Sequence, residues 1–354
     1  MLNYIRKYGP VTKSELAKET GLTFMAINKI FAEYESLGLI CKLPRKKSGS
    51  VGRNANTFSL DAQYGYTIAV HINAYRTEVA VLDLRANILA THYILMDQLN
   101  GRQDAFIHQL IGAINEVVAQ SKIDIHSILG IGIGSPGPVD AKKGIIGMAP
   151  NLPLLHYLPI KDALEKRLEL PVLLAKDTNA IALGEYWHGK GRIYQDLLYV
   201  DLDMGIGGAL VSGGNVRQGS GSMAGEIGHM LLVPEGPLCN CGNRGCLEAL
   251  SSALAIIRDG ERELTAQAEH PLFQLRNQLT VELIVDAANQ GDLLFSQLLQ
   301  RSAYHVGVAV RNMINIFDPQ LIILGGLLVQ KVPSYSVMVK DVALSLMMKG
   351  SSER

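Results

Sequence analysis

Three of the four cysteines of the chain lie within eight residues, in the run "CNCGNRGC" at positions 239–246. Such a segment must turn tightly to bring its side chains together, and Gly242 and Gly245 supply the backbone freedom for those turns. Three converging thiols could form a redox pair, remain ordinary buried thiols, or bind a metal ion. His229, ten residues before the first cysteine, offers a fourth ligand of the kind that zinc prefers.

A metal is the expected occupant of this cysteine cluster. The start of the chain, "MLNYIRKYGP", lacks the apolar core of a signal peptide, and nowhere do about eighteen apolar residues run together. We therefore expect a cytoplasmic protein, in which clustered cysteines are more often metal ligands or redox groups than disulfides. A site with four protein ligands has no open position for water, so the expected Zn²⁺ is structural. The expected ligands are His229, Cys239, Cys241 and Cys246.

Charge is distributed unevenly along the 354 residues, a length that predicts two or three domains. Lys plus Arg and Asp plus Glu number 33 each, so the whole chain has no net charge. Residues 1–60, however, carry ten basic and four acidic residues, a net charge of +6, which leaves −6 on the remainder. A basic N-terminal segment on an acidic body indicates that this segment alone contacts a polyanion.

The basic segment has the pattern of a helix-turn-helix. In "VTKSELAKETGLTFMAINKIFAEYESLGLICKLP" we expect Ser14 to cap a first helix that Gly21 ends, and Thr23 to cap a second. The second helix carries apolar residues at three- and four-residue spacing, from Ile27 to Leu37. The runs "LICKL" and "NTFSL" bracket the loop "PRKKSGSVGRNA" and predict a winged hairpin, in which Cys41 is a small buried residue. A helical bundle with a solvated basic loop is the alternative.

From Gly65 the pattern becomes that of an α/β protein. The runs "GYTIAVHI", "TEVAVLDL" and "ANILATHYIL" predict strands, and "DAFIHQLIGAINEVVAQSK" has helical periodicity. A similar order returns later, with the strand pair in "DLLYVDLDMGIGGALVSGG" and a helix before the strand "LIILGG". Two α/β units of this kind suggest a duplicated architecture with a cleft between its halves.

These segments resemble the ROK family of repressors, open reading frames and sugar kinases, and the N-terminal helices resemble its repressor branch. The most specific features are "EIGH" and "CNCGNRGCLE", and the resemblance covers roughly residues 10–330. It implies a winged helix-turn-helix followed by a duplicated, ribonuclease H-like α/β domain of the actin-like ATPase and sugar-kinase type. The implied boundaries are 1–62 for the head, 63–185 for the first half and 186–354 for the second. Beyond "LIILGG" the chain is only loosely like the family, and its C-terminal part is expected to be short.

The resemblance also implies a sugar site that uses the metal cluster. Family members hold the metal with the same histidine and three cysteines, and their sugar hydroxyls contact two acids that correspond to Glu226 and Glu248. Asp177 falls at the position of the general base of the kinases, and Lys176 stands where they usually have Asn. The implied sugar-binding residues are Asn151, Asp177, Glu226, His229 and Glu248.

The phosphate loops depart from the kinase pattern. Where the kinases have "DxGGT", this chain has "HINAYR", so that side chains occupy space that a phosphate needs. The second loop, "DMGIGGALVSGG", has Asp203 and Met204 in place of the usual Gly and Thr. We therefore expect no catalytic residues, with Asp177 left as a vestigial base, and no kinase activity.

The sequence thus predicts a sugar-responsive DNA-binding transcriptional regulator of carbohydrate metabolism, with a repressor as the expected form. Its expected partners are an operator in double-stranded DNA, a sugar or sugar-phosphate effector, and further copies in a homodimer or homotetramer. The alternatives are an ATP-dependent hexose kinase with a DNA-binding head, and an interaction module that binds a sugar-transport protein. The expected DNA contacts are Thr23, Phe24, Asn28 and Lys29 on base edges, and Lys13, Arg45, Lys46, Lys47 and Arg53 mainly on phosphates.

Overall fold

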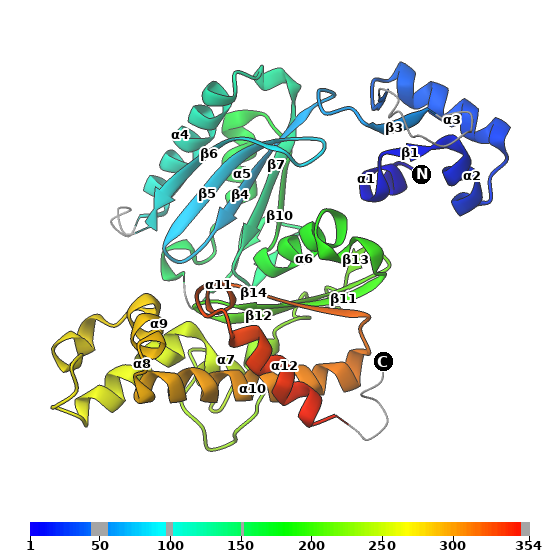
Figure 1. Ribbon diagram of the computed structural model, residues 1–354. Helices are drawn as coiled ribbons and strands as arrows, with labels where there is room; N and C mark the ends of the chain where they lie inside the picture. The colour runs from blue at the N-terminus through cyan, green and yellow to red at the C-terminus, as the bar shows by residue number, and fades with distance from the viewer. Residues whose placement is uncertain (44–55, 97–101, 150–151, 348–354) are drawn as a thin grey trace. The chain divides into compact units, whose positions relative to one another are not determined.

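The computed structural model describes residues 1–43, 56–96, 102–149 and 152–347 (Figure 1). These residues form two compact units, each of which is described by itself. Unit 1 comprises Met1–Ala180 and Gly184–Ile193, and unit 2 comprises Ile181–Leu183 and Tyr194–Arg354. Among the described residues, no helix is both long enough and apolar enough to cross a membrane.

The first part of unit 1, the head (residues 1–62), contains helices packed on a small antiparallel sheet of order β1-β3-β2. Two of the helices, α2 and α3, are joined by a short turn in which Gly21 has a φ of +68°, a conformation that favours glycine. Ile27 and Phe31 of α3 are fully buried against Phe58, so this face of the helix forms the core of the head. The elements are α1 (Leu2–Tyr8), β1 (Val11–Thr12), α2 (Lys13–Thr20), α3 (Phe24–Ser36), β2 (Ile40–Lys42) and β3 (Thr57–Leu60).

Two local expectations for the head were wrong. The cap of α2 is Thr12 and not Ser14, because Thr12 accepts a hydrogen bond from the backbone N–H of Glu15, whose side chain accepts one from the N–H of Thr12. Leu37, which the spacing placed on the apolar face of the second helix, is 54% exposed, because α3 has already ended at that residue. Thr23, in contrast, caps α3 as expected, and its hydroxyl accepts a hydrogen bond from the N–H of Ala26.

The rest of unit 1 is built on a five-stranded sheet of order β10-β7-β4-β5-β6. β4, β5 and β6 are antiparallel neighbours, whereas β7 runs parallel to both β4 and β10. The elements are β4 (Tyr66–Ile72), β5 (Arg76–Asp83), β6 (Ile88–Leu95), α4 (Gln103–Ser121), η2 (Ile125–Ser127), β7 (Ile128–Ser135), β8 (Val139–Asp140), β9 (Ile145–Ile146), η3 (Pro153–Leu155), α5 (Ile160–Leu168), β10 (Val172–Lys176), α6 (Asp177–Trp187) and η4 (Lys190–Ile193).

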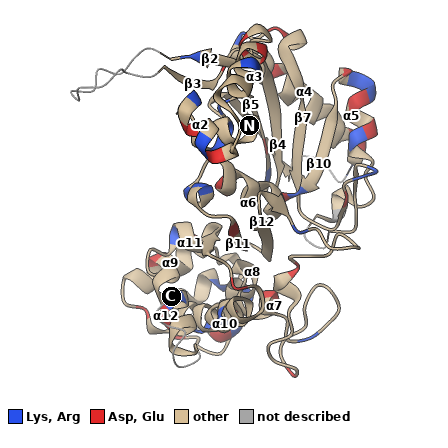
Figure 2. Ribbon diagram, turned by 90° about the vertical axis from the view of Figure 1, so that its right-hand side faces the viewer, with Lys and Arg blue, Asp and Glu red and all other residues tan. Residues whose placement is uncertain are grey.

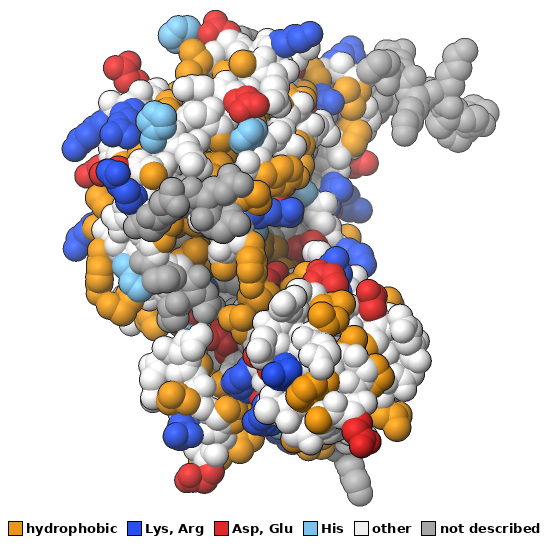
Figure 3. All heavy atoms as spheres, turned by 90° about the vertical axis from the view of Figure 1, so that its left-hand side faces the viewer, with side chains coloured by type: hydrophobic (Ala, Val, Ile, Leu, Met, Phe, Trp, Pro, Cys, Tyr) orange, Lys and Arg blue, Asp and Glu red, His pale blue; other side chains and the backbone are white. Residues whose placement is uncertain are grey.

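β6 is one of the two edge strands of this sheet, and several of its hydrophobic side chains are exposed, Ile88 by 63%. Figure 3 views the molecule from the side on which α4 lies in Figure 1, and the hydrophobic side chains of unit 1 seen there are interspersed with charged and histidine side chains. Scattered apolar side chains of this kind are normal on protein surfaces and define no binding patch.

Unit 2 repeats the start of this topology. β11 and β12 form an antiparallel pair, and β14 returns parallel to β11, as β7 returns parallel to β4. The duplication that the sequence indicates is therefore present in the order of the strands. The elements are β11 (Asp196–Leu202), β12 (Ile206–Ser212), β13 (Asn215–Val216), η5 (Ile227–His229), α7 (Leu247–Ser251), α8 (Ala253–Thr265), η6 (Phe273–Gln278), α9 (Val281–Asn289), α10 (Leu293–Phe317), β14 (Leu321–Gly325), α11 (Leu327–Lys331) and α12 (Tyr335–Ser345).

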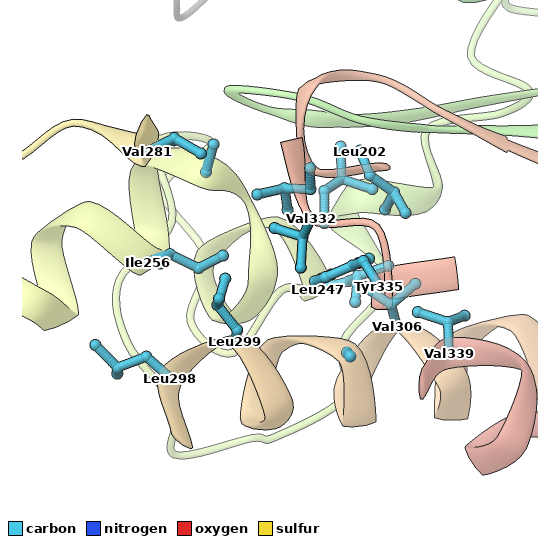
Figure 4. Packing of buried hydrophobic residues seen from close by; sticks show 14 of the residues in the cluster. Leu202, Leu247, Ile256, Val281, Leu298, Leu299, Val306, Val332, Tyr335 and Val339 are labelled. Carbon is cyan, nitrogen blue, oxygen red and sulfur yellow. The ribbon is translucent and has the colours of Figure 1, made fainter. Parts of the chain in front are cut away.

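The core of unit 2 lies along one face of the long helix α10 (Figure 4). Tyr335 of α12 is completely buried there, and its hydroxyl lies 2.5 Å from the hydroxyl of Ser302 on α10. Ser302 in turn donates a hydrogen bond of 2.9 Å to the backbone carbonyl of Ser251, the last residue of α7. The short helix α7 is thereby fixed to the core of the unit at its C-terminal end.

Candidate metal centre

The histidine and three cysteines singled out in the sequence converge in unit 2. The Sγ atom of Cys239 lies 3.7 Å from Nδ1 of His229, and the Sγ atoms of Cys241 and Cys246 are also 3.7 Å apart. All four ligand atoms lie within 4.8 Å of one another. Ligands around a tetrahedral zinc ion are about 3.5–3.8 Å apart, given Zn–S and Zn–N distances of about 2.3 and 2.0 Å. Because a disulfide needs about 2.05 Å between its sulfur atoms, the spacing matches a metal site and not a disulfide.

Backbone turns at glycine bring these ligands together. Gly242 and Gly245 have φ values of +91° and +68°, in the region where residues with a Cβ are strained. The N–H of Cys239 donates a hydrogen bond of 2.7 Å to the carbonyl of Asn243, which closes the turn that contains Cys239 and Cys241. At Gly245 a Cβ would also collide with the backbone of Val233.

The thiols differ in how readily they lose their protons. Burial raises the pKa of Cys239 to about 12, and burial also raises the pKa of Cys246. For Cys241, burial is outweighed by hydrogen bonds from the backbone of Asn243 and from the two neighbouring thiols, and its pKa is lowered. A bound metal would have to displace the protons of the two buried thiols, so its binding would release protons.

The two acids expected to bind sugar lie close in sequence to the candidate metal ligands. Cys246 is the N-cap of α7, and Glu248 lies in the first turn of that helix. The Oε2 atom of Glu248 accepts a hydrogen bond of 2.9 Å from the N–H of Ile206, at the start of β12. Glu226 is the N-cap of η5, the short helix that ends with His229. Both acids are half-buried and therefore are not the ordinary surface acids that each would resemble in isolation.

Asp177 belongs to unit 1 and begins helix α6. Its carboxylate accepts a hydrogen bond of 2.6 Å from the N–H of Thr178, which also places it at the positive end of the helix. The preceding residue, Lys176, is only 6% exposed. Asn151, the remaining residue expected to bind sugar, lies outside the described residues.

The two segments expected to depart from the kinase phosphate loops both contain side chains with partners close by in the chain. In unit 1 the segment "HINAYR" is a tight hairpin between β4 and β5, in which Asn73 pairs with the backbone of Arg76 and Tyr75 is 56% exposed. In unit 2 the carboxylate of Asp203 accepts a hydrogen bond from the N–H of Met204, whose side chain packs into the hydrophobic core. Ordinary side chains with local partners thus occupy both loops.

The head presents its expected DNA contacts at the start of α3. Phe24 is 53% exposed, and Lys29 is exposed one helical turn further on. Asn28 accepts a hydrogen bond of 3.0 Å from the ammonium group of Lys13, so these two residues act as a pair. Met25, which the sequence did not single out, is 82% exposed on the same turn as Phe24. The other expected contacts, Arg45, Lys46, Lys47 and Arg53, lie outside the described residues.

The chain belongs to the ROK family, whose model matches residues 67–353. It is 28% identical over 323 residues to the DNA-binding transcriptional dual regulator NagC of Escherichia coli, an alignment that covers 91% of this chain and 78% of that one. It is also 39% identical over 199 residues to a glucokinase of Thermotoga maritima, covering 55% of this chain and 63% of that protein. The chain thus spans less than two thirds of that glucokinase's length.

Solved structures give the same two classes of relative. A ROK family transcriptional regulator described as a homologue of the E. coli Mlc protein superimposes with a TM-score of 0.80 at 26% identity, covering 98% of this chain and 88% of that one. A ROK family glucokinase from Streptomyces griseus, in complex with glucose and AMPPNP, gives a TM-score of 0.72 at 28% identity over 81% of this chain and 91% of that one. The sugar-kinase fold is therefore established, and both regulators and kinases share it.

Proposed function

We propose that the protein is a sugar-responsive, DNA-binding transcriptional regulator, most simply a repressor of carbohydrate metabolism genes. The observation that carries the proposal is an imbalance within the chain. The four candidate metal ligands converge and Glu248 is held close to them in the chain, which supports a sugar site, whereas the hairpin "HINAYR" has side chains where the kinases have glycines. Such a chain retains the means to bind a sugar and lacks the means to phosphorylate it.

The regulator relatives support this choice because their similarity extends into the head. Residues 67–354 number 288, and the alignment with NagC covers 323 residues, so it includes part of residues 1–66. The head, proposed as residues 1–62, would be the winged helix-turn-helix, followed by the two α/β halves at 63–185 and 186–354. The exposed start of α3 would enter the major groove.

In this proposal the metal is a structural Zn²⁺ bound by His229, Cys239, Cys241 and Cys246. It fixes the start of α7, and with it Glu248, while His229 fixes η5 and Glu226. Carboxylates suit sugar hydroxyls because each oxygen accepts hydrogen bonds in a defined direction. The effector would be a sugar or sugar phosphate held by these residues together with Asn151 and Asp177.

We further propose that the protein acts as a homodimer or homotetramer. A dimer would place two α3 helices in successive major grooves about 34 Å apart, so its operator should be a near-palindrome. The effector would favour one arrangement of the two heads over another and thereby change the affinity for DNA. A sugar-transport protein is a further candidate partner.

DNA selection followed by a sugar titration tests the proposal. Duplexes that bind the full chain are selected from a random pool, and their affinity is measured by fluorescence anisotropy with a panel of hexoses, N-acetylhexosamines and their 6-phosphates. We expect a near-palindromic duplex and at least one sugar that changes its affinity. A chain that selects no duplex would contradict the proposal.

A ROK sugar kinase with a DNA-binding head is the second candidate, favoured by the retained Asp177 and by the glucokinase relatives. A coupled assay with ATP and the same hexoses separates the two. Turnover above about 1 s⁻¹, an ordinary enzyme rate, would establish the kinase and overturn our choice.

A further inference from the structure

A basic cavity lies within unit 1 where the head meets the five-stranded domain. It has a volume of about 290 Å³ and is lined by α1, β3, the turn after β5 and the end of α6. Its charged lining consists of Arg6, Arg85, His188 and Arg192, and none of the described residues that line it is acidic. We call it the junction pocket.

The arginines of the junction pocket are held in place by neutral groups. The guanidinium of Arg6 lies over the ring of Trp187, 3.5 Å from the ring centre, and its Nε atom is buried without a hydrogen-bond partner. Arg192 donates from Nε to the carbonyl of Lys7 at 2.7 Å, and Arg85 donates from Nε to the carbonyl of Leu60 at 2.7 Å. Among the described residues, none of these arginines forms a salt bridge with a carboxylate.

Arg85 has one more neutral partner, because its NH2 group lies 3.2 Å from the Sγ atom of Cys41. Cys41 is therefore half-buried and hydrogen-bonded at this junction, and the expectation that it is simply a buried apolar residue was wrong. The two contacts of Arg85 join the head to the five-stranded domain.

The positive charge in the pocket is poorly compensated. Burial lowers the pKa of Arg6. The pKa of His188 is lowered first by burial and then by the charges of Arg6 and Arg192. Like charges held close together are costly unless an opposite charge joins them.

We propose that the junction pocket binds a phosphate group, carried by a small phosphorylated metabolite or present as free phosphate, between Arg6, Arg85, Arg192 and His188. Guanidinium groups match the geometry of phosphate oxygens and make strong charge-assisted hydrogen bonds with them. The pocket volume suits a small ligand. A neighbouring cavity of about 360 Å³ shares Arg6 and His188, has a largely apolar lining that includes Leu2 and Leu129, and could take the uncharged part of an ester.

This site differs from the proposed sugar site, because Asp177, Glu226, His229 and Glu248 line neither the junction pocket nor the neighbouring cavity. A ligand bound in the junction pocket would act differently from a sugar bound at the proposed sugar site. α1 belongs to the head, whereas Trp187 and His188 lie at the end of α6, so a bound phosphate would join the head to the five-stranded domain. The ligand would therefore stabilise one position of the DNA-binding head.

Calorimetry on the full chain tests the proposal, with inorganic phosphate, a hexose 6-phosphate and the parent hexose as titrants. Inorganic phosphate should bind, and Arg192→Gln should weaken that binding about tenfold or more, the cost of a hydrogen bond to a charged group. Arg6→Gln should act in the same direction. Binding of the ester that is tighter than that of phosphate, weakened by Arg192→Gln and unchanged by Glu248→Gln, would identify a phosphorylated metabolite as the ligand of the junction pocket. Tighter binding of phosphate would identify free phosphate.

Two controls separate this site from others. Arg167→Gln removes an exposed arginine of α5, whose charged residues are coloured in Figure 2, and should leave phosphate binding unchanged. Glu248→Gln alters the proposed sugar site and should also leave it unchanged. The proposal is overturned if inorganic phosphate and the ester both fail to bind, or if both bind the Arg192→Gln and Arg6→Gln proteins as tightly as the unmodified chain.

A variant can lose phosphate binding because it misfolds, so a further measurement uses the unmodified chain. The titration of His188 is followed by NMR with and without sulfate, a dianion whose own charge does not change over this pH range. His188 faces Arg6, Arg85 and Arg192, and Asp83 lines the neighbouring cavity. Bound sulfate should raise the pKa of His188 because it offsets the three positive charges. An unchanged pKa at saturating sulfate would also overturn the proposal.

Discussion

At the scale of single residues, the metal centre can be tested with matched cysteine variants. Cys246→Ser removes a ligand but keeps a good N-cap at the start of α7, since serine is favoured at that position. We expect metal analysis to show a fall from about one zinc per chain to almost none, together with a loss of the effector response. DNA binding by the head should persist.

Cys41→Ser is the control, because Cys41 lies in β2, in unit 1, whereas the metal centre lies in unit 2. Its zinc content should equal that of the unmodified chain. A Cys246→Ser protein that still responds fully to sugar would show that the metal does not organise the effector site.

Glu248 allows charge to be separated from structure. Its Oε2 atom accepts the N–H of Ile206, and a glutamine oxygen could accept the same bond, so Glu248→Gln should fold normally. Loss of the charged acceptor should weaken sugar binding about ten- to hundredfold, as measured by calorimetry. Zinc content should be unchanged, and undiminished sugar affinity would remove Glu248 from the site.

His188 makes stability depend on pH. Its pKa is lowered from 6.5 in the folded chain by burial and by Arg6 and Arg192, so below pH 6.5 the unfolded chain takes up a proton that the folded chain does not. This contribution therefore destabilises the folded chain as pH falls from 6.5 to the folded pKa of His188. His188→Gln should flatten the fall in urea unfolding free energy over this window, measured without phosphate or sulfate.

His188→Gln should remove only part of the pH dependence of the unfolding free energy, because burial and the charge of Arg301 also lower the pKa of His305. A profile identical to that of the unmodified chain would show that the proton uptake of His188 does not differ between the folded and unfolded states.

At the scale of elements, the caps of the head helices set its local stability. Thr12→Ala removes the capping box of α2 and should cost about 1 kcal/mol. Amide hydrogen exchange within Lys13–Thr20 should then be about fivefold faster, whereas Thr12→Ser should behave like the unmodified chain. Equal exchange in the alanine and serine variants would show that the cap does not hold this helix.

The contact between α10 and α12 is the corresponding test for unit 2. Tyr335→Ala removes a completely buried aromatic side chain and should lower the unfolding free energy by about 3–5 kcal/mol. Tyr335→Phe removes only the hydroxyl, leaves Ser302 bonded to Ser251, and should cost about 1 kcal/mol. Urea unfolding distinguishes the two, and equal costs would mean that packing at Tyr335 matters little.

Features made by residues close together in the sequence were easier to predict than contacts between residues far apart in it. The convergence of His229 and the three cysteines was predictable because the cysteines lie within eight residues and their chemistry is specific. The cap of α2 was misassigned although "TKSE" has the spacing of a capping box, because Ser14 is an equally acceptable cap by residue type. In both cases the relevant residues are close together in the chain.

At the scale of the whole molecule, residues far apart in sequence come together in ways that no periodicity records. The junction pocket gathers positions 6, 85, 188 and 192, none of which belongs to a recognisable motif. The repeated hairpin and parallel strand, in contrast, follow from the order of strand-like runs, so the duplicated fold was predictable. The strand order could be inferred from local sequence patterns. The grouping of positive side chains in the junction pocket could not, because it depends on tertiary contacts.

The central claim is that sugar binding controls DNA binding in this chain, and one measurement tests it most directly. The affinity of the full chain for its selected duplex is determined by fluorescence anisotropy with and without the sugar that binds it most tightly. We predict a change of about tenfold or more, within the usual range of coupling between two sites, and no change in Cys246→Ser. A sugar that binds the chain tightly but leaves its affinity for DNA unaltered would contradict the claim.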